Sequence, residues 1–267
     1  MSVIQEADAK ARSAPSKFFS IGGPACAVII LSTVLFGCRG STEQNGSQYR
    51  VQELPGSLVE GTVRLQGTPP PAKKIQVAQD ADVCGETREV FPVRVKNGGI
   101  DDAVVWIDDI QRGKAFSFPP AQVDQGDCTF FPHIVLMHPG DVKITSRDPI
   151  PHSVHTHARH NRDYDESMSP LKPDISLSFQ EPDVIGVRCD LHSWMQAYVI
   201  VAKNPYYAIT ENGGKFKLDG VPKGHYRLKV WSENLGGSEQ MIDVEEGQPT
   251  KADFELKSPT EHAAGAD

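Results

Sequence analysis

Short apolar runs separated by turn residues dominate the chain after residue 52, and their pattern predicts strands. Apolar and polar residues alternate through residues 58–65 and 214–218, and alternation with a period of two places side chains on opposite faces of a strand. The 23 glycines and 20 prolines break the apolar runs into pieces too short for long helices. We therefore expect an all-β protein.

The predicted strands extend from residue 58 to residue 231. They are residues 58–65, 74–77, 90–95, 103–110, 128–131, 134–137, 142–145, 175–179, 184–189, 196–202, 208–210, 214–218 and 226–231. Residues 147–173 are polar and rich in His, Asp and Pro, so we predict an irregular loop there. Turn signals recur every eight to twelve residues or so, a spacing typical of β-sandwiches.

The N-terminal residues 1–37 are predicted to be a targeting segment, separate from the fold. Three basic residues precede the apolar run 18–37, which ends in Leu-Phe-Gly before Cys38. This resembles a bacterial lipoprotein signal peptide, which implies cleavage before Cys38 and a lipid on its thiol. An uncleaved anchor stays open, because the run is about long enough to cross a bilayer. Both alternatives predict an exported protein, anchored to a membrane and facing the periplasm or the exterior. Polar residues 38–52 then predict a flexible tether.

Length and charge limit the classes of partner. A chain of 267 residues can form one large or two modest domains. Its formal charge of -8, with no basic stretch after the N-terminus, argues against nucleic acid as a partner and favours a neutral or cationic protein.

The cysteine count points to one thiol with a special role. Of five cysteines, three remain once Cys26 leaves with the leader and Cys38 carries the lipid. An odd number leaves one unpaired, and a free thiol in an oxidising compartment is a liability unless it has a function. We predict a disulfide between Cys84 and Cys128, with Cys189 left for a metal.

A thiolate, an imidazole and a thioether lie within seven residues between two predicted strands. These are Cys189, His192 and Met195. Copper that cycles between Cu(I) and Cu(II) favours one thiolate, two imidazoles and a weak axial sulfur. His152, after the Gly140-Asp141 turn and the strand that follows it, is the natural second imidazole. Zinc also accepts Cys and His, but methionine is a poor zinc ligand, so the set favours copper.

The order of these motifs resembles that of the cupredoxins. Gly140-Asp141-x-x-Ile144 leads to Asp148 and His152, and Cys189-x-x-His192-x-x-Met195 then runs into an apolar strand. The pattern is similar to plastocyanin-like proteins, and the short loop is most like that of amicyanin. The resemblance implies a Greek-key cupredoxin β-sandwich over residues 123–203. It further implies one mononuclear type 1 (blue) copper site formed by His152, Cys189, His192 and Met195, with the His192 ring as a solvent-facing electron port.

One position departs from the family pattern. Cupredoxins usually follow the first histidine with Asn, whose amide ties that loop to the residue after the cysteine, whereas Ser153 stands here. The serine hydroxyl has a shorter reach, which bears on the rigidity and reduction potential of the site more than on copper binding.

Several of these residues have ordinary structural alternatives. Cys189 and Met195 are also common as core residues. Met168 is an alternative axial ligand. His155, His157 and His160 form either a metal-loading surface or a solvated loop, and we interpret His133 and His138 as structural. Leu191 and Trp194 form either an apolar rim for a docking partner or ordinary packing.

The C-terminal residues 204–257 resemble a second β-sandwich family. The pattern Gly214-x-Phe216-x-Leu218, followed by Val221-Pro222-x-Gly224-x-Tyr226, is similar to carboxypeptidase-regulatory-like, transthyretin-type modules, which act as scaffolds. About fifty residues are few for an independent sandwich. Residues 53–122 either complete this sandwich, with the cupredoxin as an insertion, or extend the cupredoxin sheet. Residues 258–267 predict a disordered tail.

We therefore expect an envelope electron carrier that passes single electrons between redox proteins docking near His192. No Ser-His-Asp or paired-carboxylate arrangement has supporting context, so we expect no enzymatic activity. The alternatives are a periplasmic copper-binding or delivery protein, and a structural cell-surface binding module with a vestigial metal site.

Overall fold

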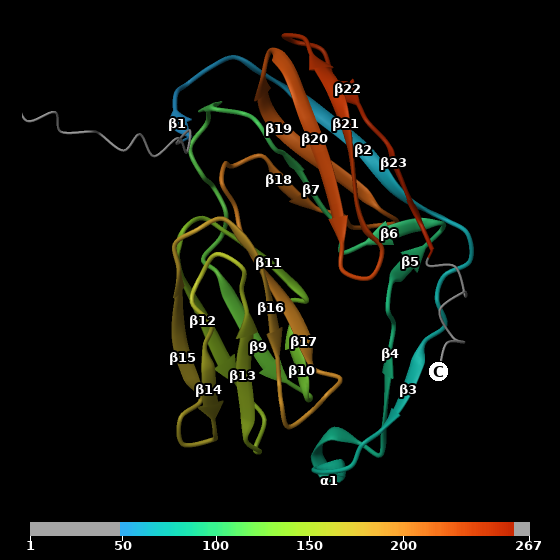
Figure 1. Ribbon diagram of the computed structural model, residues 1–267, viewed down its shortest axis with the longest axis vertical. Coiled ribbons are helices and arrows are strands. Elements are labelled where there is room, and N and C mark those ends of the chain that lie inside the picture. Colours follow the sequence, from blue (N-terminus) through green and yellow to red (C-terminus); the bar gives the residue numbers. More distant parts are fainter. Residues whose placement is uncertain (1–48, 259–267) are drawn as a thin grey trace, which may run out of the picture. The chain divides into compact units, whose positions relative to one another are not determined.

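The computed structural model describes residues 49–258 (Figure 1). Within that range the protein is all-β, with strands and one short helix, α1 (Ala81–Cys84). No helix in the described range is long and apolar enough to cross a membrane. The predicted signal peptide, the lipidation site Cys38, residues 38–48 of the tether and residues 259–267 of the tail lie outside the described residues.

One β-sandwich combines strands from both ends of the described chain. Its first sheet has the order β18-β7-β20-β21, and its second has the order β19-β2-β6-β5, with β22 and β23 also paired to β2. The strands are β2 (Gly56–Gln66), β5 (Arg94–Lys96), β6 (Gly99–Asp101), β7 (Val104–Ile107), β18 (Tyr207–Ile209), β19 (Lys215–Pro222), β20 (Gly224–Ser232), β21 (Gly236–Val244), β22 (Thr250–Lys251) and β23 (Phe254–Lys257). The N-terminal strands thus complete the C-terminal sandwich, and the other sandwich is inserted between them.

Alternation along β2 directs one face of this strand into the core of the sandwich. Val59 and Val63 point inward and are fully buried, in a core cluster with Leu228 of β20. Gly61 lies where the chain near β22 comes close, because a Cβ at Gly61 would stand 1.8 Å from the carbonyl oxygen of Ala252. A side chain at position 61 would therefore push β22 away from β2.

The inserted sandwich contains the cupredoxin-like motifs. One sheet has the order β10-β9-β12-β15, and the other has the order β11-β17-β16-β13-β14. Its strands are β9 (Gln122–Gly126), β10 (Thr129–Phe131), β11 (Ile134–Met137), β12 (Gly140–Ser146), β13 (His152–His157), β14 (Asp165–Met168), β15 (Asp174–Phe179), β16 (Asp183–Arg188) and β17 (Gln196–Val201). A separate apolar cluster fills the space between these sheets, with Val142, Ile144 and Val199 fully buried.

The prediction of an irregular loop over residues 147–173 is wrong for two parts of it, β13 and β14. In β13 the side chains of Val154 and Thr156 are fully buried, and Met168 at the end of β14 is buried as well. The many His, Asp and Ser residues on the outward face concealed this alternation in the sequence.

Two other boundaries differ from the predictions. The single strand predicted at residues 90–95 is divided into β4 (Thr87–Val90) and β5, with Pro92 between them, since proline cannot donate to a ladder. Residues 49–52, predicted as part of the tether, belong to the folded structure. There β1 (Arg50–Val51) pairs in parallel with β8 (Arg112–Gly113), and the Tyr49 hydroxyl donates to Lys114 O at 2.8 Å.

An arm formed by residues 73–90 precedes the inserted sandwich. Its strands β3 (Lys73–Gln76) and β4 pair antiparallel, and α1 lies between them (Figure 1). A disulfide between Cys84 of α1 and Cys128, which lies between β9 and β10, joins the arm to the inserted sandwich.

Candidate metal centre

Two neighbouring strands place the candidate ligands together. Cys189 follows the last residue of β16, and His152 is the first residue of β13. Because β13 and β16 run antiparallel, with His155 opposite Arg188, their adjoining ends bring His152 and Cys189 to the same edge of the sheet. His192 lies in the short loop from Cys189 to β17. The ligand atoms of His152, Cys189 and His192 all lie within 4.8 Å of one another, and all three residues are buried.

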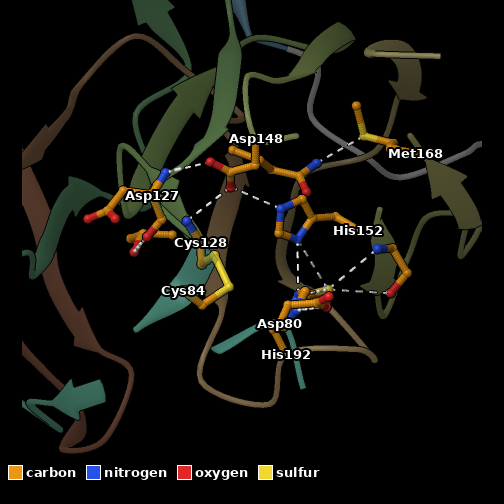
Figure 2. Close-up of polar contacts among 12 residues, drawn as sticks. Asp80, Cys84, Asp127, Cys128, Asp148, His152, Met168 and His192 are labelled. Carbon is orange, nitrogen blue, oxygen red and sulfur yellow. Dashed lines mark hydrogen bonds and ion pairs between the residues drawn. A yellow bond between two sulfur atoms is a disulfide. The ribbon is translucent and has the colours of Figure 1, made fainter. Parts of the chain in front are cut away.

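The two imidazoles face each other through Nδ1 and bind carboxylates through Nε2 (Figure 2). The Nδ1 atoms of His152 and His192 are 3.1 Å apart, and Cys189 Sγ lies 3.9 Å from the first and 3.6 Å from the second. His152 Nε2 is 2.9 Å from Asp148 Oδ2, and His192 Nε2 is 3.0 Å from Asp80 Oδ2. An ionised carboxylate only accepts, so each Nε2 carries a hydrogen and, in the neutral ring, each Nδ1 presents a lone pair.

This donor set fits a metal ion. Two lone pairs 3.1 Å apart repel each other unless a proton or a cation lies between them, and the rings of His152 and His192 are at most 1% exposed, so bulk water does not separate them. A carboxylate behind each imidazole is the usual outer partner of a metal-binding histidine, since it fixes the ring orientation and raises the basicity of the nitrogen. One thiolate with two imidazoles suits copper or zinc.

The environment of Cys189 favours the thiolate. Burial raises the pKa of its thiol. Hydrogen bonds involving His152, the Ser153 backbone N–H and His192 have the opposite and larger effect, so that the net pKa is lowered to about 6. The pKa of His152 is raised, because its interactions with Cys189 and Asp148 outweigh the opposing effect of burial. Both shifts favour the charged forms, a thiolate at Cys189 and an imidazolium at His152, and metal binding would release the imidazole proton.

Ser153 makes the connection that the family pattern assigns to Asn. Its hydroxyl accepts the Asp190 backbone N–H at 2.7 Å, and its own backbone N–H points to Cys189 Sγ at 3.4 Å. Serine therefore reaches the residue after the cysteine, because β13 lies close enough to the loop for a short side chain to suffice.

The two methionines considered as axial ligands have different surroundings. Met195 is buried, and it closes the ligand loop through its backbone: its N–H donates to His192 O at 2.9 Å, and its carbonyl accepts from Cys189 N–H at 3.2 Å. Met168, opposite His152 in β14, accepts a hydrogen bond from Gln125 Nε2 at 2.9 Å through its sulfur. The axial role of Met195 stays a prediction.

The expectation of a solvent-facing His192 ring is wrong. His192 is 0% exposed, and Asp80 lies against its Nε2 edge. Of the two rim residues, Leu191 is 44% exposed, whereas Trp194 is partly buried and donates its indole N–H to Cys128 O at 3.0 Å. Only Leu191 is left as an apolar contact at the surface of this loop.

The other histidines are separate from the buried centre. His133 Nε2 lies 2.6 Å from Glu233 of the other sandwich, and His138 donates to the neighbouring Pro139 carbonyl. His155 lies 3.1 Å from Asp190, and these two residues form a second group of potential ligand atoms with Asp165 on the surface.

Sequence reasoning missed the roles of Asp80 and Asp148. Asp148 Oδ1 accepts the Asp127 backbone N–H at 2.8 Å, while Oδ2 accepts both the Cys128 backbone N–H at 3.0 Å and the His152 ring. Its position four residues before His152 is a usable signal in the sequence. Asp80 is 112 residues from His192, and no local pattern connects the two.

Replacing Asp148 with alanine is expected to weaken both the fold and the metal site. Three hydrogen bonds to a carboxylate that is 8% exposed are lost, at a cost of roughly 3 kcal/mol in unfolding free energy. Copper affinity should fall by about 10- to 100-fold, because the His152 ring loses its outer partner. Denaturant unfolding and copper titration measure both effects. Asp141→Ala, at an exposed position of β12, is the matched control, and equal results for the two variants would contradict this role.

Comparisons with known proteins support a β-sandwich fold. Residues 186–252 match the family model described as polysaccharide lyase family 4, domain II. The match begins in β16 of the inserted sandwich and ends just after β22 of the other, so it covers well under half of the chain. This family is not the carboxypeptidase-regulatory-like one that the sequence resembles. No curated protein is similar enough to count as a match.

Solved cupredoxin structures resemble part of the chain. "Novel Purple Cupredoxin from Nitrosopumilus maritimus" is 19% identical and covers 31% of this chain and 99% of its own, with a TM-score of 0.27. An oxidized point mutant of amicyanin is 22% identical over 31% of this chain and 82% of its own, with a TM-score of 0.28. The "Cu-containing nitrite reductase (NirK) from Thermus scotoductus SA-01" is 15% identical and covers 36% of this chain and 25% of its own, with a TM-score of 0.29. The case for a metal centre comes from the convergence and burial of His152, Cys189 and His192.

Proposed function

We propose that this protein is an envelope-anchored electron carrier with one type 1 copper site. The ligands are His152, Cys189 and His192, with Met195 as the weak axial sulfur. The observation that carries the proposal is the buried convergence of two Nδ1 atoms and one thiolate sulfur, each Nδ1 belonging to a ring whose other nitrogen is bound to a carboxylate.

The protein contributes rigidity and charge to the transfer of one electron. His152, Cys189 and His192 would hold copper, which would supply a one-electron redox couple between a reduced and an oxidised partner. Asp148 and Asp80 orient the two imidazoles, and Ser153 fixes the loop beside the thiolate. A ligand set held in one geometry needs little rearrangement when the charge of the metal changes. The lipid on Cys38 keeps the carrier at the membrane, and redox proteins are its partners.

Copper binding or delivery is the second candidate function. The surface group of His155, Asp165 and Asp190 favours it, since nitrogen and oxygen ligand atoms within 4.8 Å of one another on the same sandwich could pass a metal toward the buried centre. In that case the reduction potential of the buried site has no role.

Copper titration of the full-length chain distinguishes these functions. One equivalent of Cu(II) is expected to produce an intense visible thiolate-to-copper band that a reductant bleaches and an oxidant restores. Copper bound without this band supports delivery instead. If the protein binds no stoichiometric copper, both proposals fail, and the alternative of a structural module with a vestigial site stands. Zn(II), which should bind without colour, is the control for metal binding as such.

A further inference from the structure

The arm contacts the metal-ligand loop, residues 189–195, at two points and is bonded to the inserted sandwich at a third. Asp80 Oδ2 lies 3.0 Å from His192 Nε2, and Gln79 Nε2 donates to Leu191 O at 2.8 Å. The disulfide joins Cys84, the last residue of α1, to Cys128 beside the loop. The Cys128 carbonyl in turn accepts the Trp194 indole N–H. Residues about a hundred positions earlier in the chain thus hold the loop that carries Cys189 and His192.

The geometry of Asp80 is not that of an ordinary helix cap. An Asp at an N-cap usually accepts a backbone N–H of the first helical turn through its side chain. Asp80 occupies the N-cap of α1, yet its side chain makes no such hydrogen bond. Its φ of 58° lies in the left-handed region, which Asp adopts more readily than most residues other than glycine. The carboxylate is directed to His192 instead (Figure 2).

We propose that the arm is a fixed cover over the metal-ligand loop and that Asp80 is a positioning residue for His192. The carboxylate keeps the hydrogen of this ring on Nε2, so that Nδ1 is free for the metal. Asp80 covers this edge of the ring, and the neighbouring Gln79 binds the Leu191 carbonyl beside it. This inference rests on the proposed function, since it concerns the same metal site. It also means that a redox partner contacts the arm and Leu191 rather than the His192 ring.

NMR of the isotope-labelled full-length chain without metal tests the positioning role. The nitrogen chemical shifts of the His192 ring should show one tautomer, with the hydrogen on Nε2. Asp80→Ala should give a mixture of tautomers and lower the copper affinity by about 10- to 100-fold. Asp80→Asn keeps an acceptor oxygen and should retain the single tautomer. Asp82→Ala, at an exposed position of α1 that makes no side-chain hydrogen bond to the ligand loop, should behave as the unaltered protein does.

Chemical modification tests the cover. Diethyl pyrocarbonate added to the same metal-free chain should modify His192 far more slowly than His225, whose side chain is 62% exposed. Equal rates for these two histidines would overturn the cover. An unchanged tautomer together with unchanged copper affinity in Asp80→Ala would overturn the positioning role.

The two proposals can fail separately. If copper gives no visible band while the His192 ring still responds to Asp80→Ala, the electron-carrier function is wrong and the positioning role stands. If the band forms and the ring does not respond to Asp80→Ala, only the inference about the arm is wrong.

Discussion

Cys189→Ser is expected to abolish the visible thiolate-to-copper band completely. Serine keeps the size of the side chain but has no thiolate at neutral pH, so the charge-transfer transition has no donor. Copper affinity should fall by more than about 100-fold, since even the loss of an outer partner of a ligand costs 10- to 100-fold. Visible absorption and competitive copper titration of the full-length chain measure the two effects.

The fold should survive this substitution. One buried polar exchange typically costs about 1 to 3 kcal/mol of unfolding free energy, so the circular dichroism spectrum should be unchanged. Ser193→Ala, at an exposed position of the same loop, is the control and should keep the band. A Cys189→Ser protein that still turns blue with copper would rule out Cys189 as the ligand.

Removal of the Cys84–Cys128 disulfide, whose two cysteines belong to the core of the inserted sandwich, is expected to be strongly destabilising. The bond closes a loop with a sequence separation of 44, for which loop-closure entropy predicts about 4 kcal/mol. For a folded unit of this size, that corresponds to a decrease in the midpoint of thermal unfolding of roughly 8 to 16 °C. The Cys84→Ala, Cys128→Ala double variant, followed by circular dichroism, measures it.

Chemical reduction supplies the control for this experiment. Reducing the disulfide of the unaltered protein should lower its midpoint by a similar amount and leave the double variant unaffected. A double variant that melts within about 2 °C of the unaltered protein would show that the arm is held by its other contacts instead.

Local patterns in the sequence predicted the parts of the site that lie close together in the chain. Cys189, His192 and Met195 lie within one short loop, and their spacing already limits how they can meet. The apolar strands on either side agree with the burial of Cys189 and Met195, which were weighed as core residues, whereas His192 was expected at the surface and is buried. By contrast, the strand that carries His152 was missed, because its outward face is almost entirely polar.

Contacts between distant segments could not be predicted in the same way. Alternation shows that residues 58–65 form a strand, but the alternative in which they extend a sheet of the inserted sandwich satisfied the same pattern. The pairing of β2 with β19 and of β7 with β20 shows which sandwich they complete. Pairing depends on which strand edges meet, and the period of a strand does not specify its neighbour.

The sequence by itself determined the all-β class, the ligand loop and the excess of one cysteine, because these follow from period, spacing and number. The tertiary structure alone decided that the arm reaches His192 and that Asp80, 112 residues away, covers a ring expected at the surface. Bringing such distant groups together depends on the folded arrangement of two sandwiches and a disulfide, and no interaction between neighbours in the chain encodes it.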